Sequence, residues 1–165
     1  MGRWRPPLPA SSPYITRAGY EQLQQELNDI WLRRRDVVKA LAAAAAEGDR
    51  SENAEYIYRK KELGGIDYRI RYLQKRLPNL KIVEPTQKQD KVFFGAWALL
   101  ERDDGSQVEY RIVGPDETNS DSNSISMDSP LAKALFRKSI DDEVHITVEG
   151  NSETYLITGI RYRQG

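Results

Sequence analysis

The sequence has no cysteine, a single histidine and no net formal charge in its 165 residues. The absence of cysteine excludes disulfides, cysteine-containing zinc sites, iron–sulfur clusters and a catalytic thiol. No stretch approaches the roughly 20 apolar residues that a membrane-spanning helix requires, so we expect a cytoplasmic protein that does not bind membranes. Residues 1–13 include four prolines and two arginines but lack the apolar core of a secretory signal, and we predict that they form a disordered tail.

The zero net charge hides two halves of opposite charge. Residues 1–84 carry 16 Lys and Arg against 11 Asp and Glu, whereas residues 85–165 carry 9 against 14. A basic half followed by an acidic half suggests two domains that face different partners, such as a nucleic acid and a basic protein surface. Ordinary variation in composition is the alternative. The composition changes at Pro85, so residues 85–90 are predicted to link a domain at 14–84 to one at 91–165.

Residues 14–84 are predicted to fold into an antiparallel coiled-coil hairpin. Apolar residues recur at alternating spacings of three and four over 20–44 and again over 56–77, which is the heptad pattern of a coiled coil. Thr16 is a candidate N-cap for the first helix, and Pro78 stops the second. Two helices of roughly 25–30 residues, each on the order of 40 Å long, must fold back on one another when only a few residues separate them. We therefore expect a projecting hairpin that buries one narrow seam.

Residues 91–165 are predicted to form a small domain of strands and one helix, which makes the fold class α+β with two domains. The sequence Asp103-Asp104-Gly105 is a hairpin signal, and Ser129-Pro130 is typical of the start of a helix that continues to about Lys138. An antiparallel sheet is expected from the strand-like runs at 92–100, 107–113, 125–127, 143–148 and 154–162.

The turn between the two predicted helices displays two acidic residues, Asp49 and Glu52, three positions apart. One interpretation is structural, because an N-cap aspartate followed by a glutamate three residues later forms a capping box that suits the positive end of the helix dipole. The other interpretation is functional: two carboxylates can hold Mg²⁺ through some of its six positions if a second protein supplies further ligands. Both hold at once if capping fixes the geometry of the pair.

This turn also carries the pattern of a known family. The octapeptide at 49–56, Asp-Arg-Ser-Glu-Asn-Ala-Glu-Tyr, resembles the tip of the bacterial Gre transcript-cleavage factors, and its Arg-Ser-Glu-Asn-Ala core is most like their B type. The resemblance extends from about Tyr14 to Tyr162. Three further stretches agree in order: Tyr14-Ile15-Thr16 with Gly19-Tyr20, Val92-Phe93-Phe94-Gly95-Ala96-Trp97, and Ile125-Ser126-Met127-Asp128-Ser129-Pro130-Leu131-Ala132.

The resemblance implies a transcription elongation factor. Gre factors bind bacterial RNA polymerase and insert their coiled coil into its secondary channel, where the acidic pair helps hold the second Mg²⁺ of the active centre. Asp49 and Glu52 are then the metal-assisting pair, with Ser51 in a supporting role. The polymerase cleaves the backtracked nascent RNA, and the arrested complex resumes synthesis. The chain itself is expected to be a monomer and no enzyme, to hold no cofactor tightly alone, to share Mg²⁺ with the polymerase, to contact the RNA 3′ end and to be DNA-binding.

The same resemblance assigns two further sets of residues. A basic patch on the hairpin contacts RNA in the family, and Arg59, Lys60 and Lys61 match it; a solvated coiled-coil surface is the alternative. The C-terminal domain is expected to be FKBP-like, without implying prolyl isomerase activity. Its turn at Asp128, Ser129 and Pro130 is expected to dock on the polymerase, unless it is an ordinary strand-to-helix turn.

Other prominent residues have structural explanations, and other functions stay open. His145 and Trp97 are expected to be structural, as are Phe93 and Phe94. An inhibitor that blocks the same channel would also carry an acidic tip, although the match over 49–53 favours stimulation. A coiled-coil adaptor with a peptide-binding domain is the alternative from another class. A free-standing nuclease is disfavoured, because two carboxylates on an exposed turn cannot enclose a dry site.

Overall fold

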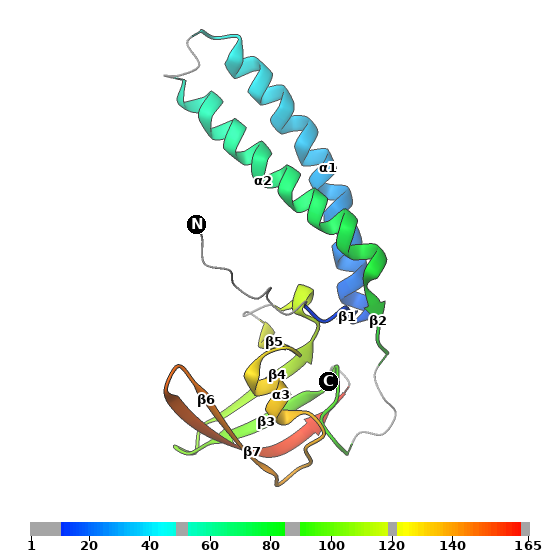
Figure 1. Cartoon of the computed structure of the whole chain (residues 1–165), viewed down its shortest axis with the longest axis vertical. Helices are drawn as coiled ribbons and strands as arrows, with labels where there is room; N and C mark the ends of the chain where they lie inside the picture. The colour runs from blue at the N-terminus through cyan, green and yellow to red at the C-terminus, as the bar shows by residue number, and fades with distance from the viewer. Residues whose placement is uncertain (1–10, 49–52, 85–89, 119–121, 163–165) are drawn as a thin grey trace, which may run out of the picture. The chain divides into compact units, whose positions relative to one another are not determined.

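The computed structural model describes residues 11–48, 53–84, 90–118 and 122–162, which fall into two compact units (Figure 1). One unit is Ala18–Leu80, and the other combines the N-terminal segment up to Arg17 with the chain from Lys81 onward. The predicted α+β fold with two domains is confirmed, since a pair of long helices precedes a sheet domain. Residues 14–17 and 81–84, at the two ends of the hairpin, belong by their contacts to the second unit.

The first unit is an antiparallel hairpin of two long helices, α1 (Arg17–Ala45) and α2 (Ala54–Arg76), which lie side by side in Figure 1. Their facing sides carry the predicted apolar seam. Its centre is buried and consists of Val37, Ile66 and Ile70, with Leu27, Ile30 and Leu63 packed around it. The other faces of both helices are mostly exposed. No helix in the described part of the chain is long and apolar enough to cross a membrane.

Ion pairs join the two helices beside the seam. Arg34 interrupts the apolar pattern, and its Nε lies 2.7 Å from Oδ1 of Asp67 on α2. Exposed pairs of this kind contribute little free energy individually, because water screens them. They do fix which turns of the helices face each other, and so they set the register of the hairpin. Two further pairs act in the same way: Arg33 with Glu62, and Arg69 with Glu26.

The ends of α2 follow from its sequence, but its interior contains an unexplained pair of glycines. The helix ends at Arg76, and a short 3₁₀ helix, η1 (Leu77–Asn79), accommodates Pro78. The helix continues unbroken through Gly64 and Gly65. A Cβ at either glycine would meet no atom within 4 Å. Neither packing within the chain nor the backbone conformation therefore requires glycine at these positions.

The second unit is built on a five-stranded sheet in the order β5-β4-β3-β7-β6. The only parallel pair among these named strands joins β4 to β5, which differs from the fully antiparallel sheet that we expected. A short helix, α3 (Pro130–Leu135), contributes Ala132 and Leu135 to a core shared with the strands. The strands are β3 (Trp97–Arg102), β4 (Gln107–Val113), β5 (Ser124–Ser126), β6 (Glu143–Val148) and β7 (Asn151–Arg161).

Two predicted elements of this unit are shorter than expected. The strand expected from Val92 begins only at Trp97, because Gly95 has a φ of +86° and turns the chain before it. The helix expected to reach Lys138 ends at Leu135. Arg137 has a φ of +69° and donates its amide to the carbonyl of Val92, which pairs the end of the helix with the segment before β3.

The segment that precedes α1 is fastened to the second unit by a carboxylate. Strand β1 (Tyr14–Ile15) pairs in parallel with β2 (Lys81–Ile82). Glu117 accepts hydrogen bonds from the Thr16 amide at 2.8 Å, from the Thr16 hydroxyl and from the Gly114 amide at 3.0 Å. Gly114 must be glycine here, because a Cβ would lie 1.9 Å from the carbonyl oxygen of Tyr14. These contacts join residues 14–16, 81–82 and 114–117 within the second unit.

Replacing Gly64 and Gly65 by alanine should stabilise α2. Glycine in a helix interior costs roughly 0.8–1 kcal/mol relative to alanine, and the added methyl groups meet open space. We expect the double variant to raise the free energy of unfolding by on the order of 1–2 kcal/mol in urea titrations followed by helical circular dichroism. Gly114→Ala is the contrasting variant and should destabilise the protein. An unchanged midpoint for the double variant would contradict this reading of α2.

Candidate functional site

The two helices are tied together at the tip by one side chain. The amide nitrogen Nδ2 of Asn53 donates to the carbonyl of Ala44 near the end of α1, at 2.7 Å. The Oδ1 atom of the same residue accepts from the amide of Tyr56 in the first turn of α2, at 3.1 Å. Before the tip, α1 ends in a turn at Gly48, whose φ is +125°. Asn53 therefore joins the described ends of the two helices on either side of residues 49–52.

This geometry corrects one interpretation of the acidic pair. The N-cap of α2 is Asn53, and the helix begins at Ala54. Asp49 is therefore not the N-cap residue of α2, so the capping box that would explain Asp49 and Glu52 is wrong. The cause is the amide of Asn53, which caps α2 and also reaches α1. The carboxylate of an aspartate at this position could accept the hydrogen bond from the Tyr56 amide, but it could not donate one to the carbonyl of Ala44. Asp49 and Glu52 themselves lie outside the described residues.

The predicted metal-assisting residues, Asp49, Ser51 and Glu52, lie outside the described residues. Among the residues that are described, no group of three or more His, Cys, Asp or Glu is placed to hold a metal ion. The donors of the predicted pair are two carboxylates, which are the hard oxygen ligands that Mg²⁺ prefers. The donor chemistry fits Mg²⁺, but two protein ligands leave most of its six positions to be filled from elsewhere.

The three predicted RNA-binding residues do not form one cluster. Arg59 is directed to its own helix, where its Nε is 2.9 Å from Glu55 and its Nη1 is 3.0 Å from Glu62. The hydrogen bond to Glu55, with the nearby charges, raises the pKa of Arg59 above its usual value. Lys60 and Lys61 are both exposed. Successive helical residues point about 100° apart, so the two lysines face different directions.

The predicted docking turn is structured by its own side chains. Ser129 caps α3, since its hydroxyl accepts from the Ala132 amide at 3.2 Å, and Pro130 occupies the first helical position. The carboxylate of Asp128 accepts from both the amide and the hydroxyl of Ser12, with 3.0 Å to the amide nitrogen. Asp128 thus anchors the N-terminal segment at Ser12. A partner that binds the Asp128 carboxylate has to share it with Ser12.

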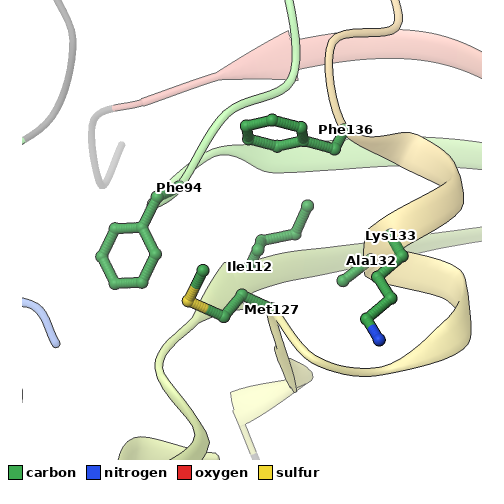
Figure 2. Close-up of a pocket in the computed structure, with 6 residues that line it drawn as sticks. All are labelled: Phe94, Ile112, Met127, Ala132, Lys133 and Phe136. Carbon is green, nitrogen blue, oxygen red and sulfur yellow. The ribbon is translucent and has the colours of Figure 1, made fainter. Parts of the chain in front are cut away.

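An apolar cavity of about 190 Å³ opens beside this turn. Figure 2 shows Phe94 and Phe136 on different sides of it, with Ile112 and Met127 between them and Lys133 at its edge. Phe136 is 44% exposed, and its ring packs edge-on against Phe93 with 5.6 Å between ring centroids. Met127 and Ala132, which line the cavity, flank the predicted docking turn in the sequence.

Sequence reasoning missed this cavity and the bridge at the tip. We expected Phe93 and Phe94 to be core residues, yet Phe94 lines the opening. The signal available in the sequence was Phe136, an aromatic residue directly after a short amphipathic helix. Trp97 is largely covered, as expected for a structural residue: its indole lies beneath Arg161 at 4.5 Å and Arg111 at 5.7 Å, and its Nε1 atom is buried. His145 Nδ1 lies 2.9 Å from the Thr154 hydroxyl across the β6–β7 pair.

Comparison with known proteins identifies the family. Residues 13–82 match the family described as "Transcription elongation factor, N-terminal", and residues 86–162 match "Transcription elongation factor, GreA/GreB, C-term". The chain belongs to the GreA/GreB family of transcription elongation factors. The resemblance drawn from the tip octapeptide is thereby confirmed for the whole chain and not for the tip alone.

Sequence relatives extend over nearly all of this GreA/GreB-family chain. Transcription elongation factor GreB of Xanthomonas axonopodis pv. citri is 52% identical, with 98% of each chain covered. The GreB of Pseudomonas aeruginosa is 50% identical, again with 98% of each chain covered, and that of Yersinia pestis is 52% identical over 93% of this chain and 91% of its own. The names of these relatives agree with the predicted likeness to the B type.

Solved structures of the same family match at lower identity. Gfh1, a GreA factor homologue of Thermus thermophilus, is 25% identical over 90% of this chain and 97% of its own, with a TM-score of 0.41. The transcription elongation factor GreA/GreB of Nitrosomonas europaea is 17% identical over 92% of this chain and 100% of its own, with a TM-score of 0.42. Membership of the family rests on the sequence relatives.

Variants of Asn53 should distinguish how much each of its two hydrogen bonds contributes to the stability of the hairpin. Replacing an N-cap by alanine costs typically about 1 kcal/mol, so Asn53→Ala should lower the free energy of unfolding of the hairpin by at least that amount. Asn53→Ser keeps an oxygen acceptor for the Tyr56 amide but cannot reach Ala44, and should recover only part of the loss. Urea unfolding followed by circular dichroism measures both. Equal stability of Asn53→Ala and the native protein would mean that the bridge contributes nothing.

Proposed function

We propose that this Gre-family chain binds bacterial RNA polymerase, places its hairpin tip in the secondary channel and stimulates the cleavage of backtracked nascent RNA. The observation that carries the proposal is the bridge made by Asn53 between the ends of α1 and α2. It joins the two helices on either side of the sequence that contains Asp49 and Glu52, at the end of a hairpin with a buried apolar seam. In this proposal the two carboxylates, which lie between the described ends of the helices, act on a partner's metal ion.

The chemistry of the proposal divides the work between the two proteins. Mg²⁺ in such a site neutralises phosphate charge and activates a water molecule for attack on a phosphodiester. The chain contributes two carboxylates and the stiff hairpin that carries them, while the polymerase supplies the remaining ligands and the RNA. Two carboxylates on an exposed turn do not exclude water, so the chain alone is no nuclease. Ser51, between the two carboxylates, supports their orientation.

In this proposal, the second unit docks the chain on the polymerase. The turn at Asp128, Ser129 and Pro130 lies next to the cavity lined by Phe94 and Phe136, and an apolar opening with polar edges is typical of a protein interaction site. A side chain from the polymerase that fills this opening would hold the factor while the hairpin occupies the channel. Docking and stimulation then depend on separate residues and can be tested separately.

Replacing the acidic pair should abolish stimulation without abolishing binding. Backtracked elongation complexes with labelled RNA and Mg²⁺ are mixed with the native chain or with the Asp49→Asn/Glu52→Gln variant, and 3′-end cleavage is followed in time. The amides keep the size of the side chains but lose the charge that holds a cation. We expect at least a hundredfold slower cleavage with the variant and unchanged affinity for the polymerase, measured by competition with the native chain.

The outcomes of this experiment decide between the functions considered above. If the native chain slows nucleotide addition and never accelerates cleavage, it is a channel-blocking inhibitor and the proposal is wrong. If it neither binds the polymerase nor affects cleavage, the adaptor function is favoured. Cleavage by the chain without polymerase would identify a free-standing nuclease.

Phe136→Ala should weaken docking. Phe136 is 44% exposed and lines the cavity, so truncation removes a contact with little loss of core packing. We expect polymerase affinity to fall about tenfold, as for an interface residue worth roughly 1–2 kcal/mol, and cleavage to recover at higher factor concentration. Ile140→Ala is the matched control, because Ile140 is 49% exposed and does not line the cavity. Equal affinities of both variants would place docking elsewhere.

A further inference from the structure

The start of the described chain is fastened close to the apolar cavity of the second unit. The amide and the hydroxyl of Ser12 both donate to the carboxylate of Asp128. The carbonyl of Pro13 accepts from the amide of Lys81 at 2.7 Å, which fixes the next residue as well. Asp128 follows Met127, which lines the cavity, and neighbouring Cα atoms lie about 3.8 Å apart. The chain that precedes Ser12 therefore starts near the cavity.

The cavity has the size and the chemistry to hold an aromatic ring. Its volume is about 190 Å³, and in other proteins an apolar cavity of about 150 Å³ binds benzene. Figure 2 shows around this space the side chains of Phe94, Ile112, Met127 and Phe136, with Lys133 at the edge. An ammonium group is attracted to the face of an aromatic ring, an interaction that an aliphatic occupant does not offer to Lys133. The lining therefore favours an aromatic side chain over an aliphatic one.

The ten residues before the described structure, which we call the N-terminal tail, carry one such side chain. They read Met-Gly-Arg-Trp-Arg-Pro-Pro-Leu-Pro-Ala and lie outside the described residues. Trp4 is the only aromatic residue among them, and three prolines follow it. Proline-rich chains favour the extended polyproline II conformation, which loses little entropy when it binds to an aromatic-lined groove. The sequence of the tail thus combines an aromatic anchor with a backbone suited to such a groove.

The tail is long enough to bring its tryptophan into the cavity. Trp4 stands eight positions before Ser12. A polyproline II chain rises about 3.1 Å per residue, so eight residues extend over about 25 Å. This length allows the chain to turn back from Ser12 to the side chains beside Asp128. The segment up to Arg17 also belongs to the same compact unit as the residues that line the cavity.

The charges of the tail are complementary to those of the second unit. The tail has two arginines, Arg3 and Arg5, and no acidic residue, whereas residues 85–165 carry 14 acidic residues against 9 Lys and Arg. Attraction between opposite net charges acts over a distance and does not depend on one exact geometry. It therefore favours a tail that stays close to the second unit, while the apolar cavity selects the residue that binds.

We infer that the N-terminal tail is the resident ligand of the apolar cavity, with the indole of Trp4 inside it. Because the tail is tethered at Ser12, its effective concentration at the cavity is on the order of millimolar, which favours it over a free peptide or a second copy of the chain. A partner that docks through Phe94 and Phe136 has to displace the tail first. This last consequence rests on the docking proposed above, whereas occupation of the cavity in the free chain does not.

The test uses the free, full-length chain and its methionines. The sequence has two, Met1 and Met127, so methionine labelled with ¹³C at the methyl group gives a simple spectrum, and Met127→Leu identifies the signal from the cavity. A ring inside the cavity shifts the Met127 methyl signal through its ring current. We expect Trp4→Ala to move this signal and Trp4→Phe, which keeps a ring, to move it less. An unchanged signal in Trp4→Ala overturns the inference.

Two controls separate occupation by the tail from other effects. Trp31→Ala removes a tryptophan that is 43% exposed on α1, outside the tail, and should leave the Met127 signal in place. Diluting the native chain about tenfold should also leave the signal in place, because a tethered ligand binds independently of the protein concentration. A signal that moves on dilution would identify a second copy of the chain as the occupant and would overturn the inference.

A spin label distinguishes a bound tail from one that is only tethered nearby. The chain has no cysteine, so Gly2→Cys supplies a single site for a nitroxide. The nitroxide should broaden the Met127 methyl signal, and its diamagnetic analogue should not. In the Gly2→Cys/Trp4→Ala variant the broadening should be weaker, because the tail is still tethered but has lost its anchor. Equal broadening in the two variants would show that Trp4 does not hold the tail in the cavity.

Measurements with polymerase keep this inference distinct from the proposed function. A cavity that is free in about a fifth of the chains binds its partner about fivefold more weakly than an open one, so Trp4→Ala should raise the affinity for polymerase about fivefold. Competition with the native chain measures this change. If the Met127 signal responds to Trp4→Ala but the affinity is unchanged, the tail fills the cavity and the proposed docking through the cavity is wrong. If the affinity falls, Trp4 is a polymerase contact and its role as a competitor is wrong.

Discussion

The first unit depends on one narrow apolar seam between α1 and α2. The seam buries Val37, Ile66 and Ile70 and leaves most of the remaining surface of both helices in water. A hairpin of this kind has little core to lose, so its register has to be fixed by polar contacts at its edges. Arg34 interrupts the apolar pattern of the seam, and its side chain donates a hydrogen bond to Asp67 on the other helix. This ion pair helps to set the register of the two helices.

In each unit a single side chain makes several hydrogen bonds at once. At the tip, one amide caps α2 and holds α1, which an aspartate could not do. In the second unit, the carboxylate of Glu117 accepts hydrogen bonds from three donors of Thr16 and Gly114, and that of Asp128 accepts two from Ser12. A residue that makes several such hydrogen bonds is hard to replace. Asn53 flanks the tip, and Asp128 belongs to the predicted docking turn.

Local signals in the sequence predicted the helices well, because heptad spacing and proline report directly on the backbone. The limits of β4 and β6 were predicted for the same reason, from turns that flank them. The parallel pairing of β5, the early end of α3 and the late start of β3 were not, since they depend on contacts between distant segments such as Arg137 with Val92. At the tip, the role predicted for Asp49 and Glu52 stays a prediction, and the spacing of the pair suggested the wrong cap, because only the structure shows that Asn53 caps α2 and reaches Ala44.

The pairing of β1 with β2 has a topological consequence. One residue, Thr16, separates β1 from the hairpin helix α1, and one residue, Leu80, separates η1 from β2. Their parallel register, with Lys81 donating to Pro13 and Val83 donating to Ile15, brings the two ends of the hairpin together. The hairpin is thus an excursion that leaves and re-enters the second unit at a single place. We therefore expect that the segment between Thr16 and Leu80 can be exchanged as one piece between family members while the strand order of the second unit is kept.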